Sequence, residues 1–223
     1  MTPEFSAVVT PIYFQVLTLL DDLAAGEPPS LDEVMARTRT WIESADRRAA
    51  SSRELAAEFA LARYGLVAWI DEVLVDSNWG KAAGWGGMNH VLEFVFYGTR
   101  NCFKHFYEEA KAAEVALEQK RATSDPLETY YVCVAMGFLG RGAQDPEFLD
   151  AWVKNLDVKL ELYSPAPPRP FPQKDLPSPG LTPRRGAEVL LRVSLLVALT
   201  AVVTVIAYIT TINTWYDRVF GPG

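Results

Sequence analysis

The sequence predicts an all-α protein, in which a domain of about seven helices is followed by a proline-rich spacer and a single C-terminal membrane helix. Apolar residues recur at helical spacing through the first part of the chain, no segment alternates as a half-buried strand would, and a long uncharged run lies near the C-terminus. The predicted boundaries are residues 1–164 for the domain, 165–188 for the spacer, 189–216 for the anchor and 217–223 for a short tail.

The first two predicted helices have clear start and stop signals. Eight apolar residues over positions 5–23 follow the three- and four-residue spacing of one helical face, and Gly26 with the prolines after it ends that helix. Ser30 followed by Glu33 is a capping box, which opens a second helix that runs to about Ala50.

The middle of the domain holds the longest predicted helix and a glycine-rich loop. The helix is expected over residues 53–76, and its second half is apolar on nearly every side. Residues 78–87 contain four glycines and two tryptophans, Trp79 and Trp85, and are predicted to form a loop. A phosphate loop is excluded because no strand precedes it and no Gly-Lys-Ser/Thr follows it. We expect the tryptophans to pack over helix ends, with a binding surface as the alternative.

Four further helices complete the predicted domain. They are expected at residues 89–96, 101–119, 125–138 and 145–163. Gly98 breaks the first of them, and Asp125 and Asp145 each stand directly before a proline, which is a strong helix start. So many helices joined by short loops predict a helical bundle.

The predicted anchor has no charged residue at positions 193–212, and these 20 residues would span about 30 Å as a helix, the thickness of a bilayer core. Three arginines lie just before the run and only Arg218 follows it, so the positive-inside rule places the domain in the cytosol and the C-terminus across the membrane. A buried core helix is the alternative. The expected membrane contacts are Val193, Leu196, Leu199, Val203, Ile206 and Ile209, with Trp215 and Tyr216 at the far interface.

Charge separates the domain from the rest of the chain. Residues 1–164 carry 15 Lys and Arg against 25 Asp and Glu, within a total net charge of −7. This balance argues against nucleic-acid binding and suits a basic protein partner. Eight prolines at positions 165–183 indicate a semi-rigid spacer. Two cysteines cannot build a disulfide framework, and two histidines at unsuitable spacing indicate no metal site and no cofactor.

Asp71 and Glu72 are the strongest candidate site, because they interrupt an otherwise apolar helix. Adjacent helical residues lie about 100° apart, so we expect one carboxylate inside and the other at an edge. A buried carboxylate needs a partner, for which Arg63, Arg100 and Arg141 are the candidates. The pair is interpreted either as a core ion pair or as a partner-docking site at a cleft.

Catalysis is not expected, because no nucleophile, metal or cofactor motif accompanies these carboxylates. A membrane-anchored hydrolase that uses them is the competing hypothesis.

Three blocks of sequence, in order, resemble the signature blocks of the TssL family, also called DotU or IcmH. The blocks are YGLVAWIDEVLVDSNWG (Tyr64–Gly80), FVFYGTRNCFKHFYEEA (Phe94–Ala110) and LETYYVCVAMGFLGRG (Leu127–Gly142). Departures include Thr99, where family members often carry an acid after the glycine, and Leu139, where an acid often precedes Gly-Arg.

The resemblance implies a hook-shaped cytosolic domain of two small helical bundles with a cleft between them, anchored in the bacterial inner membrane as part of a type VI secretion system. It implies no catalysis. The expected partners are a TssM-like (IcmF) inner-membrane protein, a TssK-like baseplate protein and, indirectly, a TssJ-like lipoprotein. Asp71 and Glu72 match the family's acidic pair, and Gly98 matches the glycine of the second block. Together with Trp79 and Trp85, these are the expected partner-binding residues.

Two other hypotheses are also consistent with the sequence. It is similar also to the stabilising component of some type IV secretion systems, and an unrelated tail-anchored adaptor would share its layout. Small residues such as Ala201 and Thr204 in the anchor would allow two copies to associate as a homodimer.

Overall fold

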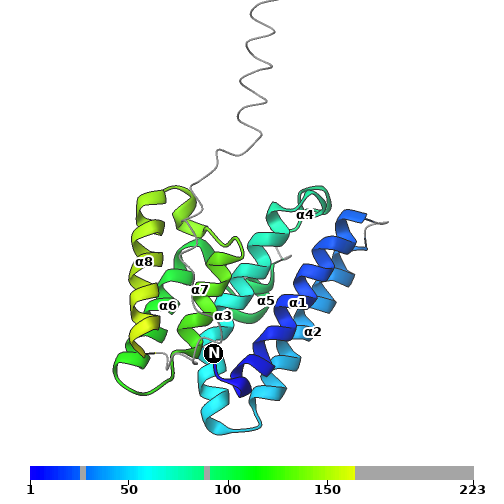
Figure 1. The fold of residues 1–223 in the computed structure, drawn as a ribbon. Coiled ribbons are helices and arrows are strands. Elements are labelled where there is room, and N and C mark those ends of the chain that lie inside the picture. The colour runs from blue at the N-terminus through cyan, green and yellow to red at the C-terminus, as the bar shows by residue number, and fades with distance from the viewer. Residues whose placement is uncertain (26–28, 88–90, 164–223) are drawn as a thin grey trace, which may run out of the picture. The chain divides into compact units, whose positions relative to one another are not determined.

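The computed structural model describes residues 1–25, 29–87 and 91–163, and within these ranges the chain is all-helical, with no strand (Figure 1). The elements are α1 (Pro3–Ala25), α2 (Leu31–Ala49), α3 (Arg53–Asp76), α4 (Asn78–Ala83), α5 (Leu92–Tyr97), α6 (Cys102–Glu118), α7 (Asp125–Ala135), the 3-10 helix η1 (Gly140–Ala143) and α8 (Pro146–Tyr163). The expected spacer, membrane anchor and tail lie outside the described residues.

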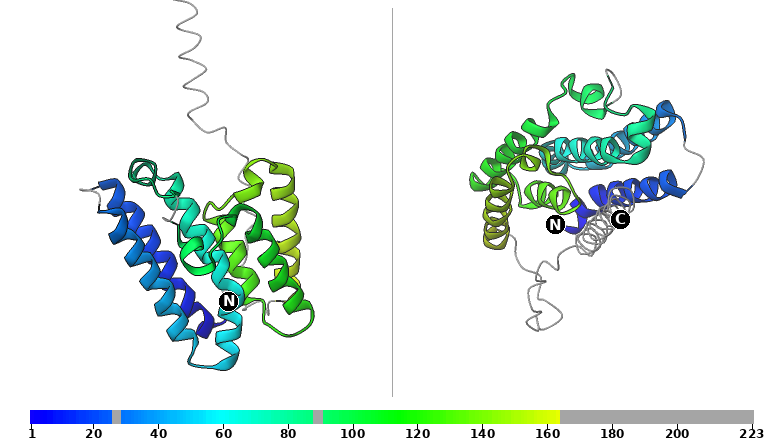
Figure 2. Two further views of the ribbon diagram at one scale, coloured as in Figure 1. Left: turned by 180° about the vertical axis from the view of Figure 1, so that it is seen from behind. Right: turned by 90° about the horizontal axis from the view of Figure 1, so that it is seen from above.

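Helix α3 is the centre of the domain. It packs against α1 and α2 on one side and against α6 and α7 on the other, and it also contacts α4 and α5 (Figures 1 and 2). Helix α8 packs on α7 and η1. This arrangement agrees with the apolar character of α3, since a helix covered on most sides needs apolar residues all round.

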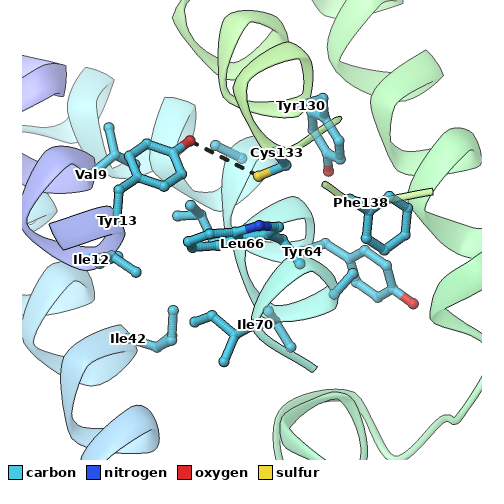
Figure 3. Packing of buried hydrophobic residues seen from close by; sticks show 14 of the residues in the cluster. Val9, Ile12, Tyr13, Ile42, Tyr64, Leu66, Ile70, Tyr130, Cys133 and Phe138 are labelled. Atoms are coloured by element: carbon cyan, nitrogen blue, oxygen red, sulfur yellow. Dashed lines mark hydrogen bonds between the residues drawn. The ribbon is translucent and has the colours of Figure 1, made fainter. Parts of the chain in front are cut away.

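The buried side chains form one apolar cluster that joins the helices (Figure 3). Tyr13 of α1 lies against Trp69 of α3, with ring centroids 5.3 Å apart. Its hydroxyl faces Cys133 of α7, with 4.0 Å between the oxygen and the sulfur. Ile42 of α2 and Leu66 of α3 are fully buried in the same cluster.

The helix starts follow the predicted caps in most places. The Glu33 amide donates to Ser30 Oγ at 3.3 Å, as the capping box predicts. The Leu55 amide donates to Ser52 Oγ at 3.0 Å, a cap that was not predicted. The Phe148 amide donates to Asp145 Oδ1 at 2.9 Å, so Asp145 caps α8 as expected. These local signals were sufficient because each cap involves residues only three positions apart.

The prediction of a loop over residues 78–87 is wrong for its first half, where α4 forms, so the described residues contain eight α-helices and not seven. Ser77 caps α4, because the Gly80 amide donates to its Oγ at 2.8 Å. Trp79 is buried and its indole N–H donates to the Pro29 carbonyl at 3.2 Å. Tertiary anchoring of this tryptophan outweighs the low helix propensity of the glycines.

Helix α7 begins at Asp125, the predicted start, but it ends earlier than predicted. It ends at Ala135, because Gly137 adopts a left-handed conformation with φ 105° and the Phe138 amide donates back to the Cys133 carbonyl at 3.0 Å. Asp125 is the first residue of the helix, and its carboxylate accepts the Thr2 amide at 2.9 Å. This acid therefore holds the N-terminal segment on α7 and does not cap its own helix.

By length and composition alone, α1 could cross a membrane. Among the described residues, it is the one helix that is both long and apolar enough to do so. Seven of its residues are buried in the domain, so packing inside the domain also accounts for its apolar character. The expected anchor at 193–212 lies outside the described residues.

Gly65 allows α3 and α7 to approach closely. A Cβ at this position would lie 2.8 Å from Cε1 of the buried Tyr130 ring. We predict that Gly65→Ala lowers the free energy of unfolding by roughly 1–3 kcal/mol, the usual cost of overpacking a core. Urea unfolding of the full-length chain in mild detergent measures this. A gain in stability, as expected for Gly→Ala in an unconstrained helix, would contradict the close approach.

Candidate functional site

A pocket of about 360 Å³ lies where α3, α5 and the start of α6 meet. We call it the acidic pocket, because three carboxylates line it. Its lining residues are Asp71, Glu72, Val75, Gly86, Val91, Glu93, Arg100 and Cys102. Both acids singled out in the sequence therefore face one cavity.

Asp71 is buried and is held by N–H donors of the chain. Its Oδ1 accepts the Leu92 amide at 2.8 Å and the Trp85 indole N–H at 3.2 Å, and its Oδ2 accepts the Glu93 amide at 2.8 Å. Because Leu92 is the first residue of α5, Asp71 caps that helix from α3. It thereby positions both the 84–87 turn and α5.

Burial raises the pKa of Asp71 to about 7, against the lowering effect of its three N–H donors. A folded-state pKa above the unfolded value of about 4 means that the folded chain binds this proton more tightly. We therefore predict that the stability contributed by Asp71 falls as the pH rises from about 4 to about 7 and is constant above that. The measurement is the free energy of unfolding of wild type minus that of Asp71→Asn, which cannot titrate. A difference that grows with pH would contradict the prediction.

Glu72 lies at the edge of the pocket and is half-buried. Its carboxylate accepts the Leu139 amide at 2.7 Å and the Gly140 amide at 3.0 Å. Burial raises its pKa, and these two hydrogen bonds oppose the shift. Glu72 therefore joins α3 to the turn between α7 and η1. The division expected from the sequence, one acid inside and one at an edge, is confirmed.

The arginine partners expected for these acids bind elsewhere. Arg63 donates to Asp46 and to the Tyr97 hydroxyl, at 3.2 Å and 3.0 Å. Arg100 donates to the carbonyls of Gly86 and Gly87. The side chain of Arg141 lies outside what the structure describes. The interpretation of a core ion pair with Arg63 or Arg100 is therefore wrong, because neutral backbone and indole N–H groups take the place of the guanidinium.

Glu93 is the third acid that lines the pocket, and the sequence analysis did not single it out. It is buried, and it accepts hydrogen bonds from the hydroxyls of Tyr64 and Thr99 at 2.6 Å and 2.8 Å. It also accepts the amides of Asn101 and Cys102 at 3.0 Å and 2.9 Å, and so caps α6. Its signal was present, because it is the one charged residue in the apolar run of residues 91–97.

The other three predicted contact residues, Trp79, Trp85 and Gly98, have mainly structural roles. Trp79 and Trp85 are both buried, with ring centroids 6.0 Å apart, and only Trp85 hydrogen bonds to the acidic pocket. Gly98 ends α5 with φ 68°, a left-handed conformation that favours glycine. Their role in partner binding stays a prediction.

The chemistry available in the acidic pocket is that of charge and hydrogen bonding. Burial raises the pKa of the Cys102 thiol to about 12, so it is protonated at neutral pH and a poor nucleophile. Across the described part of the chain, no group of three or more His, Cys, Asp or Glu residues could hold a metal ion. The lining of the pocket holds three carboxylic acids and one guanidinium.

Comparison with known protein families gives a match over most of the chain. A family model described as "Type VI secretion system protein DotU" matches residues 7–215. The chain belongs to the DotU family. DotU proteins are membrane-associated components of secretion systems, and the TssL and IcmH names are consistent with this match. No curated protein and no solved structure was found to match the chain.

Proposed function

We propose that this DotU protein is a non-catalytic, membrane-anchored scaffold of a type VI secretion membrane complex. In this proposal its helical domain docks a TssM-like inner-membrane protein and a TssK-like baseplate protein, and it reaches a TssJ-like lipoprotein indirectly. The family match supports the secretion role, and its description favours type VI over type IV secretion.

The observation that carries the proposal is the excess of acidic groups in the acidic pocket, where three carboxylates and one guanidinium line the cavity. Asp71, Glu72 and Glu93 accept hydrogen bonds from amide, indole and hydroxyl donors, and His105 Nδ1 lies 3.9 Å from Glu93 Oε1. Arg100, the one cation among the lining residues, is engaged with two backbone carbonyls. A pocket of this kind suits a basic group of a partner protein, since charge complementarity raises both specificity and association rate.

The membrane arrangement forms part of the same proposal. The family match continues through residue 215 and so includes the uncharged run at 193–212. We infer a single-pass anchor in the bacterial inner membrane, with the domain in the cytoplasm and the C-terminus in the periplasm. The two-bundle, hook-like shape and a homodimer through the anchor are further elements of this proposal.

Charge reversal at the pocket edge tests the docking role. We expect Glu72→Lys to lower the recovery of TssM-like and TssK-like proteins about tenfold when the full-length chain is purified from membranes in mild detergent. Glu72→Gln removes the charge but keeps a hydrogen-bond acceptor, so it distinguishes weaker binding caused by lost charge from weaker binding caused by a lost fold. Glu161→Lys, on the exposed side of α8, is the matched control. If the wild-type chain recovers neither partner, or if Glu72→Lys recovers both normally, the proposal fails.

A further inference from the structure

Three exposed apolar side chains belong to residues that line the acidic pocket or are next to its lining residues through sequence or a backbone hydrogen bond. Val75, Phe103 and Leu139 are 37%, 50% and 41% exposed, respectively. We call them the apolar rim. They come from three different elements, namely α3, α6 and the turn before η1, so their gathering is a consequence of the fold and not of sequence proximity.

Backbone contacts place each rim residue beside the pocket. Val75 itself lines the cavity, and the Leu139 amide donates to Glu72 at 2.7 Å. Phe103 follows Cys102, another lining residue. The Phe103 carbonyl lies 3.1 Å from the place a Cβ would occupy on Gly140, so the backbones of these two segments are in contact.

The rim is held rigidly. Leu139 is fixed on both sides of its peptide unit, because its amide donates to Glu72 and its carbonyl accepts the Tyr107 hydroxyl at 2.7 Å. A surface whose backbone is fixed before binding loses little conformational entropy when a partner binds. Exposed apolar side chains around a polar centre are a common mark of a protein interaction site.

We propose that the occupant of this surface is a segment of a partner protein that carries a lysine or arginine between apolar side chains. The basic group enters the acidic pocket, and the apolar neighbours pack on Val75, Phe103 and Leu139. This inference rests on the proposed docking function and names the chemistry of the partner segment. In this arrangement the apolar rim supplies salt-resistant affinity, and the carboxylates supply specificity for the basic group.

Charge decides between a protein segment and a membrane surface as the occupant. Residues 1–164 carry ten more acidic than basic residues, and three carboxylates line the pocket inside the rim. Anionic lipid repels such a face, whereas a basic protein segment is attracted to it.

Site-specific photocrosslinking in the bacterium tests the identity of the occupant. A benzoylphenylalanine is placed at position 103 or 139 of the full-length chain, with position 158 on α8 as the control, because Val158 is 64% exposed and remote in sequence from the rim. We expect crosslinks from 103 and 139 to a partner protein, at a peptide that contains Lys or Arg flanked by apolar residues, and none to that peptide from 158. Crosslinks only to lipid, only to a second copy, or to a peptide without a basic residue would overturn the proposal.

A pair of double variants tests the energetic role of the rim. Phe103→Ser with Leu139→Ser should lower partner recovery about tenfold even at high salt, whereas Val158→Ser with Leu162→Ser, a more exposed apolar pair, should leave it unchanged. An unchanged thermal midpoint shows that the rim variant is folded. If the wild-type chain recovers partners and the rim variant recovers them equally well, the rim proposal fails while the docking function stands. If the wild-type chain recovers no partner, both fail.

Discussion

Glu93→Ala is expected to lower the free energy of unfolding by roughly 3 kcal/mol or more. The substitution removes the acceptor for two hydroxyls and two amides, which belong to Tyr64, Thr99, Asn101 and Cys102. Each buried donor that loses its partner costs about 1–3 kcal/mol, although the losses are not fully additive within one network. The start of α6 loses its cap in the same step.

Urea unfolding of the full-length chain in mild detergent, followed by tryptophan fluorescence, measures this loss. Glu93→Gln retains one acceptor oxygen and should fall between wild type and Glu93→Ala. Glu109→Ala, which removes an exposed acid from α6, should change the stability by less than about 0.5 kcal/mol. Equal stabilities for Glu93→Ala and Glu109→Ala would show that Glu93 is not a capping residue.

Asp71→Ala should be nearly as destabilising, again by roughly 3 kcal/mol, because three buried N–H donors lose their acceptor. Its effect should also be visible locally. The Trp85 indole donates to Asp71, so the variant should change the near-ultraviolet circular dichroism of the tryptophans before any global unfolding.

The matched control is Asp76→Ala, which removes an exposed acid at the end of the same helix and should leave both stability and spectrum unchanged. If Asp71→Ala is as stable as wild type but loses its partners, then Asp71 contacts the partner directly. The expected result is loss of stability and of partner binding together.

Local signals predicted most of the helical layout. Ser30 and Asp145 each cap a helix through a hydrogen bond to a residue three positions later, so the sequence was sufficient to locate those helix starts. Helix α4 was missed because its glycines disfavour a helix locally, whereas the contact that anchors Trp79 spans 50 residues. Such a long-range contact leaves no periodic pattern in the sequence.

The sequence pointed to two of the three acids that line the pocket, but not to their hydrogen-bond donors. Asp71 and Glu72 stood out by their apolar surroundings, and one lies inside and the other at an edge. Their donors are backbone amides at positions 92–93 and 139–140, which become neighbours only after folding. Backbone amides occur at almost every position and so give no sequence signal, whereas arginines are visible in the sequence and were therefore expected as the partners.

The three carboxylates of the acidic pocket form a connected structural unit. Asp71 caps α5, Glu93 on α5 caps α6, and Glu72 holds the turn that leads into η1. The acids therefore fix the relative positions of the elements around the pocket, and their hydrogen-bond donors are backbone amides, an indole and hydroxyls. One set of residues thus serves both the fold and the proposed docking surface.

Amide hydrogen exchange on the full-length chain, alone and with the proposed TssK-like partner bound, tests this account most directly. We predict slower exchange on binding at residues 72–75, 84–87, 100–103 and 136–140, with α8 and the first turn of α3 unchanged. Protection confined to α8 or α1, or a bound complex with no change around the acidic pocket, would contradict the claim that the protein works through contact at this site.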